Sequence, residues 1–573
     1  MADNTNKVFS SSVRVVIECL DCGHQAPFSI TSNVCPNCGG FWREAKYNYD
    51  LINHNLPILV KDRWFDLWRY REVLPIHGPN PVITMGEGGT PLIHAVNLGM
   101  MLGCPNIFIK DERQGPTNSF KDRQAAMSIS ALKDAGITEA VLFSTGNVAI
   151  AYSAYAARAG IKLWTFLTSL VPAEKMREVA LYGSQVVKVT ASYDQTKQVA
   201  VEFARQRGLY LERGSRSITS VEAMKTIAYE IAEQLANVPE IQSSTQNNSP
   251  SESIWRAPDW YIQAVSGGLG PHGVQKGFME LHQMGLINKI PAMANIQTEG
   301  CAPMVHAWKQ GQDEADVIRS PRTHITTLST GDPGRTYTIL RQRMLQSGGG
   351  VFDCVTDEEA FRTMHILAKM EGISMEPAAA VAFAGLIKLV RSGQIKPNDV
   401  VVINCSGHTM PIETMILGEG WTRDLEITPE GLNDKPEEGL FSALEPVTSE
   451  RFPRVAIIDD TPDARRLIRR ILQSQGNFTL FEASNGREAI ELAKNELPDL
   501  IILDLMMPEI DGFSVLDVLK DDERTAMIPI IVVTAKELST NEKARLSGRI
   551  HTLMQKGEFM NDDLLDEVTS LLK

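Results

Sequence analysis

Short runs of apolar residues alternate with amphipathic segments along most of this 573-residue chain. The runs are AVLFS (Ala140–Ser144), KLWTFL, QVVKVT, DWYIQAV and VVVINCS (Val400–Ser406). This alternation predicts an α/β fold in which helices cover both faces of parallel sheets. Ligands bind such sheets at the carboxyl ends of the strands. Three polar or glycine-rich motifs follow strands here: STGN (144–147), SGGLG (266–270) and CSGH (405–408).

A second set of strand-like runs follows a boundary segment. Ile427–Pro453 is rich in proline, glycine and acidic residues, as linkers tend to be. Arg454–Lys573 then contains RVAIIDD, FTLFEAS, DLIILDL, IPIIVVTA and IHTLMQK, with amphipathic segments between and after them. Five βα repeats in this length predict a flavodoxin-like, doubly wound domain. In the first part of the chain, the polar stretch Gln242–Ser253 predicts a surface loop.

Charge and composition narrow the function classes. The formal net charge is −14 and no basic stripe is present, which argues against nucleic-acid binding. No apolar run approaches the length of a membrane span, and the amino terminus lacks the features of a signal peptide. We therefore expect a cytoplasmic protein without nucleic-acid or membrane partners. Eight cysteines in this length do not make a disulfide scaffold.

Four of the cysteines have the spacing of metal ligands. Cys19 and Cys22 form one pair, and Cys35 and Cys38 form a second pair twelve residues later. Two such turns bring four sulfur ligands together for tetrahedral zinc. Two disulfides are the weaker alternative in a reducing compartment. Four sulfurs leave no open position, so the zinc is expected to be structural, with His24 at the surface.

The segment Gly115–Arg123, GPTNSFKDR, precedes the helix-forming run QAAMSISALKDAG. Ser119 is suited to cap that helix, and Lys121 would then lie in the first turn. A cation is unfavourable at that end of the helix dipole, whereas an anion or a carbonyl-bearing cofactor is favoured. A lysine there can carry a Schiff base. By position alone, a solvated lysine at a helix start is the plainer alternative.

Four motifs, taken together, resemble the threonine synthase family, in the fold-type II group of pyridoxal-phosphate enzymes. They are EGGTPL (87–92), SFKDR (119–123), STGNVAIAYSAYAARAG (144–160) and SGGLGPHG (266–273). The resemblance covers roughly the first three quarters of the chain and implies two parallel-sheet α/β subdomains. Relatives often carry a zinc ribbon at the amino end. We therefore expect a ribbon at 1–45, a catalytic domain at 46–426, a linker at 427–453 and the doubly wound domain at 454–573.

The resemblance gives each motif a role. Lys121 would hold pyridoxal phosphate and then move the α-proton of the substrate, and Asn147 would bind the phenolic oxygen, although it could also be a turn residue. Ser406 would face the pyridine nitrogen, and a neutral hydroxyl there suits elimination and replacement. Glu376 lies near the substrate or is stabilised by the dipole of its own helix. The cradle for the cofactor phosphate would be Gly267, Gly268, Leu269 and Gly270.

The resemblance implies that O-phosphohomoserine and water react to give threonine and phosphate, in a homodimer. Ser220 departs from the family, because an arginine that helps to hold the substrate phosphate is usual there. Candidates to replace it are Arg213, Arg216, Lys225 and Arg335. The alternatives are cysteate synthase-like replacement on phosphoserine, threonine or diaminopropionate ammonia-lyase activity, and a signalling adaptor whose enzyme-like part only binds a ligand. Retention of Lys121 argues against the adaptor.

In Arg454–Lys573, carboxylates lie at the ends of the strand-like runs. Asp459 and Asp460 end the first strand of this segment and Asp504 ends its third. Converging carboxylates repel one another, so they call for a hard cation such as Mg²⁺. With Thr534 and Lys556 ending the fourth and fifth strands, the segment resembles the receiver domain of response regulators.

This second resemblance implies that Asp504 accepts a phosphoryl group from a histidine kinase or phosphotransfer protein. Mg²⁺ would be held by Asp459, Asp460 and the carbonyl of Met506, and the phosphoryl oxygens would be contacted by Thr534 and Lys556. Two positions depart from the pattern: Gly557 stands where proline is usual, and Leu553 replaces the usual switch aromatic.

Overall fold

A computed structural model describes residues 14–52, 55–76, 82–144, 146–169, 171–190, 193–239, 255–408, 452–475, 478–536, 538–556 and 561–572. The chain divides into two compact units. The predicted loop 242–253 and nearly all of the predicted linker 427–453 lie outside the described residues.

A small antiparallel sheet with the order β2-β1-β3 forms the ribbon at the amino end of the first unit. Its strands are β1 (Val15–Cys19), β2 (Gln25–Ala26) and β3 (Arg43–Tyr47). Ile17, Ala45 and Tyr47 belong to the large hydrophobic cluster of the first unit. The ribbon is therefore packed into the enzyme-like core.

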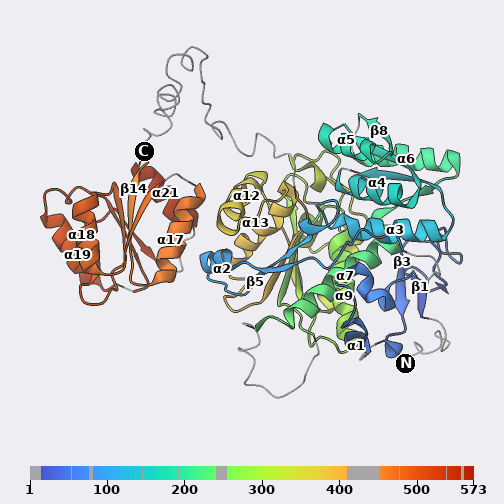
Figure 1. Cartoon of the computed structure of the whole chain (residues 1–573). Helices are drawn as coiled ribbons and strands as arrows, with labels where there is room; N and C mark the ends of the chain where they lie inside the picture. Colours follow the sequence, from blue (N-terminus) through green and yellow to red (C-terminus); the bar gives the residue numbers. More distant parts are fainter. Residues whose placement is uncertain are drawn as a thin grey trace, which may run out of the picture. The chain divides into compact units, whose positions relative to one another are not determined.

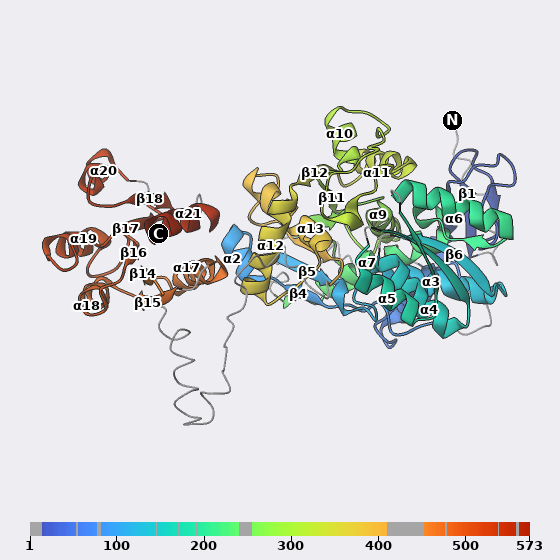
Figure 2. The same ribbon diagram turned by 90° about the horizontal axis from the view of Figure 1, so that it is seen from above.

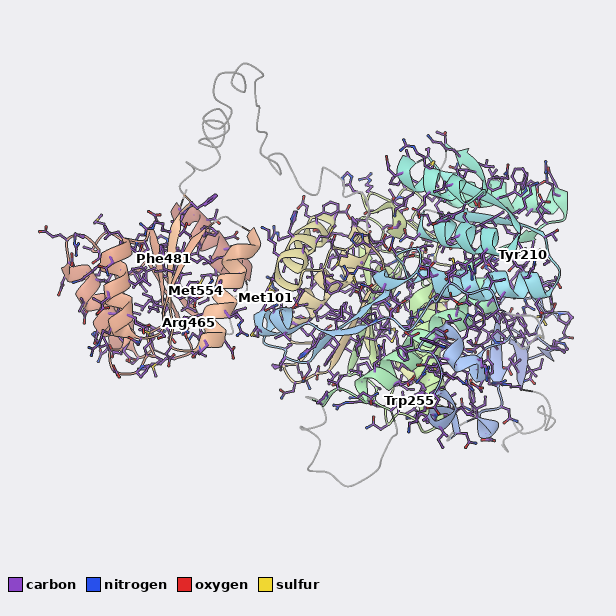
Figure 3. The ribbon with its side chains drawn as sticks, viewed as in Figure 1. Met101, Tyr210, Trp255, Arg465, Phe481 and Met554 are labelled. Atoms are coloured by element: carbon purple, nitrogen blue, oxygen red, sulfur yellow. The ribbon has the colours of Figure 1, made fainter. Side chains whose placement is uncertain are left out.

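The first parallel sheet has the order β8-β7-β6-β9. Its strands are β6 (Glu139–Ser144), β7 (Lys162–Thr168), β8 (Gln185–Val189) and β9 (Tyr210–Leu211), which carries the Tyr210 labelled in Figure 3. The surrounding helices are α3 (Lys121–Asp134), α4 (Asn147–Ala159), α5 (Ala173–Leu181) and α6 (Tyr193–Arg207). Successive side chains of a strand point to opposite faces. Accordingly Ala140 and Leu142 join the cluster with α3 and α4, and Val141 joins the cluster with α6.

The second sheet of this unit has the order β12-β11-β10-β13-β5-β4, in which only the β4–β5 pair is antiparallel. Its strands are β4 (Leu92–His94), β5 (Ile107–Asp111), β10 (Trp260–Ala264), β11 (Ala292–Thr298), β12 (Gly350–Val355) and β13 (Val401–Cys405). The central strand β13 is buried throughout, which explains why its sequence, VVINC, is apolar except for Asn404.

Helices between these strands are α1 (Leu56–Val60), α2 (Val96–Leu102), α7 (Ile218–Leu235), α9 (Leu269–Gln283), α10 (Pro303–Lys309), α11 (Arg335–Gln346), α12 (Asp357–Glu371) and α13 (Pro377–Arg391). Short 3₁₀ helices are η1 (Tyr49–Leu51), η3 (Leu67–Val73), η4 (Glu112–Gln114), η5 (Gly214–Arg216) and η7 (Thr326–Leu328). Helices α7 and α9 lie side by side (Figures 1 and 2) and approach closely at Gly277, where a Cβ would lie 2.5 Å from the Lys225 carbonyl oxygen. Among the described residues, no helix is long and apolar enough to span a bilayer.

The second unit contains a five-stranded parallel sheet with the order β15-β14-β16-β17-β18. Its strands are β14 (Arg454–Ile458), β15 (Thr479–Ala483), β16 (Leu500–Leu503), β17 (Ile530–Thr534) and β18 (Thr552–Gln555). Its helices are α17 (Pro462–Gln475), α18 (Gly486–Glu496), α19 (Gly512–Asp521), α20 (Thr540–Leu546) and α21 (Asn561–Leu572). One hydrophobic cluster joins the sheet to α17 and α21, and the other joins it to α18, α19 and α20. When the five strands are numbered by their order in the sequence, their order across the sheet is 2-1-3-4-5. The predicted flavodoxin-like arrangement is therefore confirmed.

Candidate active site and receiver pocket

A cavity of about 260 Å³ lies in the first unit, at the carboxyl ends of strands from both parallel sheets. Strand β6 ends at Ser144, β10 at Ala264 and β13 at Cys405, directly before the three motifs predicted to follow strands. The residues predicted to bind the cofactor all line this cavity: Lys121, Asn147, Gly267, Gly268, Leu269, Gly270 and Ser406. The fold therefore brings together residues that are up to 285 positions apart in the chain (406 minus 121).

Lys121 is the first residue of α3. Its Nζ lies 4.1 Å from the centroid of the Phe120 ring and has no hydrogen-bond partner among the described residues. Burial lowers the pKa of the Lys121 amine to about 8, although the charge of Glu376 acts in the opposite direction. A substantial fraction of the amine is therefore neutral and nucleophilic near neutral pH.

The start of α3 differs from the prediction. Phe120, not Ser119, is the N-cap residue, and the buried Ser119 hydroxyl has no partner within the described chain. The Ser119 backbone forms a bridge with Gly407, so the tertiary pairing sets how the chain enters the helix. The carboxylate of Asp122, inside the first turn, accepts hydrogen bonds from the backbone N and Oγ1 of Thr117 at 2.9 and 2.6 Å.

Asn147 lies between a carboxylate and an amine. Its Nδ2 donates to Oε1 and Oε2 of Glu376 at 2.9 and 2.8 Å, and Lys175 Nζ donates to its Oδ1 at 2.9 Å. A lysine can only donate and a carboxylate can only accept, so these partners determine the orientation of the amide. The Glu376 side chain makes no capping hydrogen bond to α13, which favours a role in the site over helix stabilisation alone. Lys175 was not identified from the sequence, where it resembles any exposed lysine at a helix start.

The glycine-rich loop opens α9. Gly268 has φ +89°, and a Cβ on it would lie 2.6 Å from Cγ2 of Thr336. A Cβ on Gly270 would lie 2.3 Å from Nε2 of Gln263. First-turn amides of a helix lack partners within the helix and attract anions. The glycine loop and the first-turn amides of α9 fit the phosphate of pyridoxal phosphate. Lys121, in the same cavity, fits its aldehyde.

Ser406 lines the cavity, and its carbonyl oxygen accepts a hydrogen bond of 3.0 Å from the amide of Phe120. This bond attaches the end of β13 directly to the residue before Lys121. The neighbouring Cys405 is buried, and burial raises the pKa of its thiol. Cys405 is thus a packing residue, as predicted.

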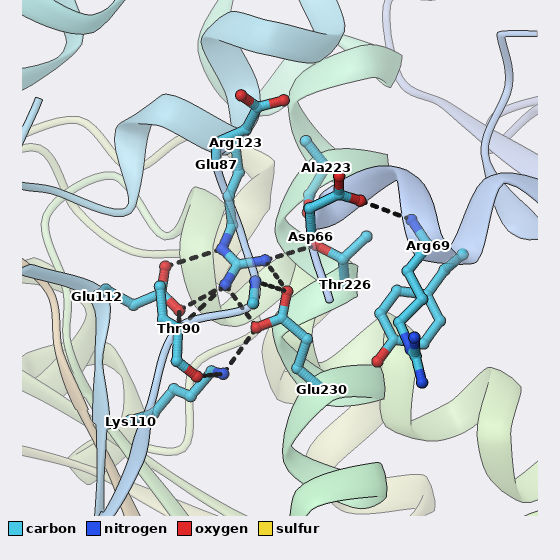
Figure 4. Close-up of polar contacts among 12 residues, drawn as sticks. Asp66, Arg69, Glu87, Thr90, Lys110, Glu112, Arg123, Ala223, Thr226 and Glu230 are labelled. Atoms are coloured by element: carbon cyan, nitrogen blue, oxygen red, sulfur yellow. Dashed lines mark hydrogen bonds and ion pairs between the residues drawn. The ribbon is translucent and has the colours of Figure 1, made fainter. Parts of the chain in front are cut away.

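A buried ionic network supports the start of α3 (Figure 4). Arg123 donates to both carboxylate oxygens of Glu112 and of Glu230, over distances of 2.5 to 2.8 Å. Lys110 Nζ contacts Glu230 Oε2 at 2.7 Å and the Thr90 carbonyl oxygen at 2.6 Å. Burial acts to raise the pKa of Glu230, but the charges of Arg123 and Lys110 outweigh it and hold that pKa at about 2. The network joins α3 to β5, η4 and α7.

The EGGTPL motif also has a structural role. Glu87 is fully buried and accepts hydrogen bonds from Trp68 Nε1 at 2.8 Å and from the Tyr155 hydroxyl at 2.7 Å. The amide of Gly89 donates to Glu230 Oε1 at 2.9 Å, which connects the motif to the ionic network.

Ser220 and Lys225 lie inside the protein and not on the cavity lining. Ser220 Oγ donates to Glu212 at 3.1 Å. Lys225 is fully buried between Glu222 and Glu280, at 2.5 and 2.9 Å. Lys225 therefore cannot replace the family arginine, because its charge is already neutralised inside the core.

The other three candidates to replace the family arginine differ in whether they line the cavity. Arg335 pairs with Asp21 of the ribbon and is absent from the cavity lining. Arg213 and Arg216 both line the cavity. Only these two candidates are placed where they could contact a substrate.

The four cysteine Sγ atoms of the ribbon lie within 4.8 Å of one another. Cys19 and Cys38 are 3.6 Å apart at sulfur, and Cys22 and Cys35 are 3.7 Å apart. A tetrahedron with Zn–S bonds of about 2.3 Å has sulfurs about 3.8 Å apart, so the set fits zinc. These separations are too long for disulfide bonds. His24 is exposed, as expected.

The acidic residues of the second unit also converge. Asp459, Asp460 and Asp504 each place a carboxylate oxygen within 4.8 Å of the others, at the carboxyl ends of β14 and β16. Lys556 Nζ lies 2.5 Å from both Asp459 and Asp504. Burial and the charge of Asp504 raise the pKa of Asp459 despite its bond to Lys556. This donor set of clustered carboxylates fits Mg²⁺.

The remaining receiver positions border the same cluster. Thr534 is the last residue of β17, and its carbonyl oxygen accepts a 2.8 Å hydrogen bond from the amide of Lys556. The amide of Met506 donates to Asp504 Oδ1 at 3.1 Å. Leu553 lies on β18 with 39% of its surface exposed, and Gly557 falls outside the described residues.

Comparisons with known proteins agree with both parts of the chain. Residues 83–407 match the family described as pyridoxal-phosphate dependent enzyme, and residues 455–569 match the response regulator receiver domain. A threonine synthase from Methanocaldococcus jannaschii is 31% identical over 392 residues, which cover 68% of this chain and 91% of that protein. A threonine synthase from Methanosarcina acetivorans is 29% identical over 395 residues, covering 69% and 91%. The solved structure of diaminopropionate ammonia lyase from Escherichia coli is 15% identical with a TM-score of 0.48, and the match covers 65% of this chain and 93% of that chain.

Proposed function

Since the chain belongs to the family of pyridoxal-phosphate dependent enzymes and carries a receiver domain, we propose that it is a threonine synthase with a phosphorylatable regulatory domain. The reaction converts O-phosphohomoserine and water into threonine and phosphate. One observation carries the proposal: a single cavity contains Lys121, Asn147, the glycine loop and Ser406. The two relatives that match over 91% of their length are named threonine synthases.

Four groups of the chain would hold the cofactor. The amine of Lys121 would bind its aldehyde, the first-turn amides of α9 its phosphate, Asn147 its phenolic oxygen and Ser406 its ring nitrogen. When bound, pyridoxal phosphate supplies the electron sink for negative charge at the α-carbon of the substrate. The neutral hydroxyl of Ser406 leaves the ring nitrogen without a carboxylate partner, which favours replacement over transamination.

Lys121 would also transfer the proton. When its amine is free, Lys121 could accept the α-proton of the substrate and return it later. A pKa of about 8 allows both steps near neutral pH, because a base works best when its pKa lies close to the working pH. Glu376 and Lys175 hold the amide of Asn147 by hydrogen bonds and so fix its orientation in the cavity wall.

The test is phosphate release from O-phosphohomoserine by the pyridoxal-phosphate-loaded protein, with threonine identified as the second product. Lys121→Ala is the inactive control. Ammonia release from threonine or diaminopropionate, with no phosphate released from O-phosphohomoserine, would contradict the proposal and favour an ammonia-lyase. A protein that has no visible cofactor absorption and is inactive on all of these substrates would instead be a ligand-binding adaptor.

For the second unit we propose that Asp504 accepts a phosphoryl group from a histidine kinase or a phosphotransfer protein. Asp459 and Asp460, with the Met506 carbonyl, would hold Mg²⁺, which neutralises the incoming oxygens. Thr534 and Lys556 would then contact the product. The convergence of the three carboxylates with Lys556 supports this assignment.

We also propose a cytoplasmic homodimer. No disulfide bond joins any of the eight cysteines, all of which lie within the described residues, and this suits a reducing compartment. Ile58 and Trp64 expose 73% and 89% of their surfaces, and we propose them as contacts of the subunit interface. Sedimentation equilibrium would contradict the dimer if the chain were monomeric at micromolar concentration.

A further inference from the structure

We propose that the metal-binding ribbon forms the wall of the cavity that recognises the substrate. In this arrangement Phe41 and Trp42 of the ribbon hold Arg213 and Arg216, and these arginines bind a phosphate group on the side chain of the amino-acid substrate. The inference rests on the proposed function and specifies which residues replace the family arginine at Ser220.

The two arginines have no anionic partner within the described part of the chain. Arg213 directly precedes η5 and Arg216 is its last residue; both line the cavity, and neither forms an ion pair within the described residues. The Nε of Arg213 is buried without a hydrogen-bond acceptor. A buried guanidinium donor without an acceptor is costly, so the site is incomplete without an anion.

The carboxylates on the cavity lining are Glu212, Asp332 and Glu376, and each accepts a hydrogen bond from another residue, as Asp332 does from the amide of Gly334 at 2.9 Å. Glu212 accepts hydrogen bonds from Ser220 and from the amide of Gly214, both at 3.1 Å. Glu376 accepts from Asn147. Besides the two arginines and Lys121, the lining carries a fourth cation, Lys197 of α6, which also lacks a carboxylate partner among the described residues. The two arginines and Lys197, without such a partner, match a doubly charged phosphate better than a carboxylate or a neutral side chain.

Aromatic residues of the ribbon orient these arginines. The guanidinium of Arg216 lies 5.7 Å from the Trp42 ring centroid and 5.8 Å from that of Phe41. The guanidinium of Arg213 lies 5.7 Å from the Phe41 centroid. Stacking on an aromatic face restricts a guanidinium and leaves its donors free for an oxyanion. Trp42 itself also lines the cavity, so the ribbon contributes directly to the site.

The metal ligands control where these aromatic residues lie. The carbonyl oxygen of Trp42 accepts a 2.9 Å hydrogen bond from Leu20, which lies between Cys19 and Cys22. The carbonyl oxygen of Gly40 accepts a 2.8 Å bond from the amide of Cys35. Zinc bound to the four sulfurs would therefore hold Phe41 and Trp42 through both cysteine turns.

A second connection between the ribbon and η5 runs through the start of α11. Asp21, in the first cysteine turn, pairs with Arg335 at the start of α11. The next residue, Thr336, donates from its hydroxyl to that of Ser215, which lies between the two arginines, at 3.1 Å. Loss of the metal should thus weaken the support of the arginines from two directions.

The first experiment measures binding of inorganic phosphate to the cofactor-loaded protein by calorimetry, together with kcat and KM for O-phosphohomoserine. Arg216→Gln and Arg213→Gln should each weaken phosphate binding and raise KM by at least about tenfold, with little change in kcat or in cofactor absorption. Trp42→Ala should do the same, and Trp42→Phe should largely restore binding. Arg205→Gln, an exposed arginine of α6 paired with Glu202, is the matched control and should bind phosphate as the wild type does.

The second experiment removes the metal from the full-length holoenzyme with a chelator and follows zinc content, phosphate binding and the unfolding temperature. We expect phosphate binding to fall as in Trp42→Ala and to return when zinc is restored. Unchanged phosphate binding in Arg216→Gln, or in folded metal-free protein, would overturn the inference. If the wild type binds phosphate through Arg216 but releases none from O-phosphohomoserine, only the proposed reaction fails, because binding is measured without turnover.

Discussion

Lys121 differs from a surface lysine in its protonation, and the difference comes from burial. An ordinary lysine, with a pKa of about 10.4, is almost entirely protonated at pH 7 and is a poor nucleophile. At a pKa of about 8, roughly a tenth of the Lys121 amine is neutral at pH 7.

This protonation gives a pH prediction. If the protein is stripped of cofactor with hydroxylamine and then reloaded, the rate of covalent cofactor binding should rise about tenfold per pH unit below pH 8 and level off above it. The sign follows because only the neutral amine attacks the aldehyde. Absorption after rapid mixing measures the rate. A rate that keeps rising up to pH 10 would mean that Lys121 has an ordinary pKa.

Lys121→Ala should abolish covalent labelling when the loaded protein is treated with borohydride, because Lys121, the first residue of α3, is the proposed attachment site on a cavity lining that also carries Lys197. Mass spectrometry of the reduced protein checks this. A labelled peptide from the variant would show that a different lysine is the attachment site.

Lys175 has a positioning role that can be tested separately. Lys175→Met removes the donor to Asn147 Oδ1. The Asn147 amide is then held only through its hydrogen bonds to Glu376 and can change its orientation. We expect kcat to fall roughly ten- to a hundredfold and the visible absorption maximum of the bound cofactor to shift. Lys162→Met is the control, because Lys162 is half exposed at the first position of β7, where it pairs with Glu139 and lies over the Trp164 ring. An unchanged spectrum and kcat in Lys175→Met would rule this role out.

At the scale of elements, the ionic network of Figure 4 attaches α3 to α7 and β5. Burying charged groups is expensive, and each charge here is tolerated because its partners are complete. The folded-state pKa of Glu230, about 2, lies below its unfolded value, so this stabilisation is present at neutral pH. It is lost as the pH falls through the acid range towards 2.

Glu230→Gln should lower the free energy of unfolding of the first unit by about 3–5 kcal/mol at pH 7, because Arg123 and Lys110 then lose their shared carboxylate. The difference from wild type should shrink below pH 4. Urea denaturation at several pH values measures it. Glu202→Gln on the exposed face of α6 is the control and should change little. If Glu230→Gln lowered the free energy of unfolding as little as Glu202→Gln does, the network would have to relax around the neutral side chain.

At the scale of the whole molecule, the question is how phosphorylation of one unit affects the other. Leu553 has no polar group or ring to report a movement of Thr534, so we expect the coupling to use a route other than the usual aromatic switch. The linker or a dimer contact are the two candidates.

Asp504→Asn should prevent labelling by acetyl phosphate and Mg²⁺, and phosphorylation of the wild type should change turnover or oligomeric state by at least about twofold. Beryllofluoride, which mimics the phosphoryl group, should reproduce the effect in the wild type only. If the wild type is not labelled while Mg²⁺ is bound, Asp504 is not a phosphoacceptor. If it is labelled without any change in turnover or assembly, the receiver does not regulate the enzyme.

The sequence by itself determined the order of the strands and helices, the five-repeat arrangement of the second unit and the two cysteine pairs. These follow from local patterns, since a buried parallel strand must be apolar and a metal-binding turn must have short spacing. The strand-end motifs were also predictable, because the carboxyl edge of a sheet follows from the order of the elements.

Only the tertiary structure decided which of several chemically similar residues lie where they can contact a substrate or cofactor. The sequence did not distinguish Arg213 and Arg216 from Lys225, because the burial of Lys225 between Glu222 and Glu280 depends on how α9 packs against α7. It suggested Ser119 as a helix cap, which a backbone bridge to Gly407 overrides. The contacts of Asn147 with Glu376 and of Trp42 with Arg216 join positions more than 170 residues apart. Charge and orientation depend on such long-range packing, so local sequence patterns cannot specify them.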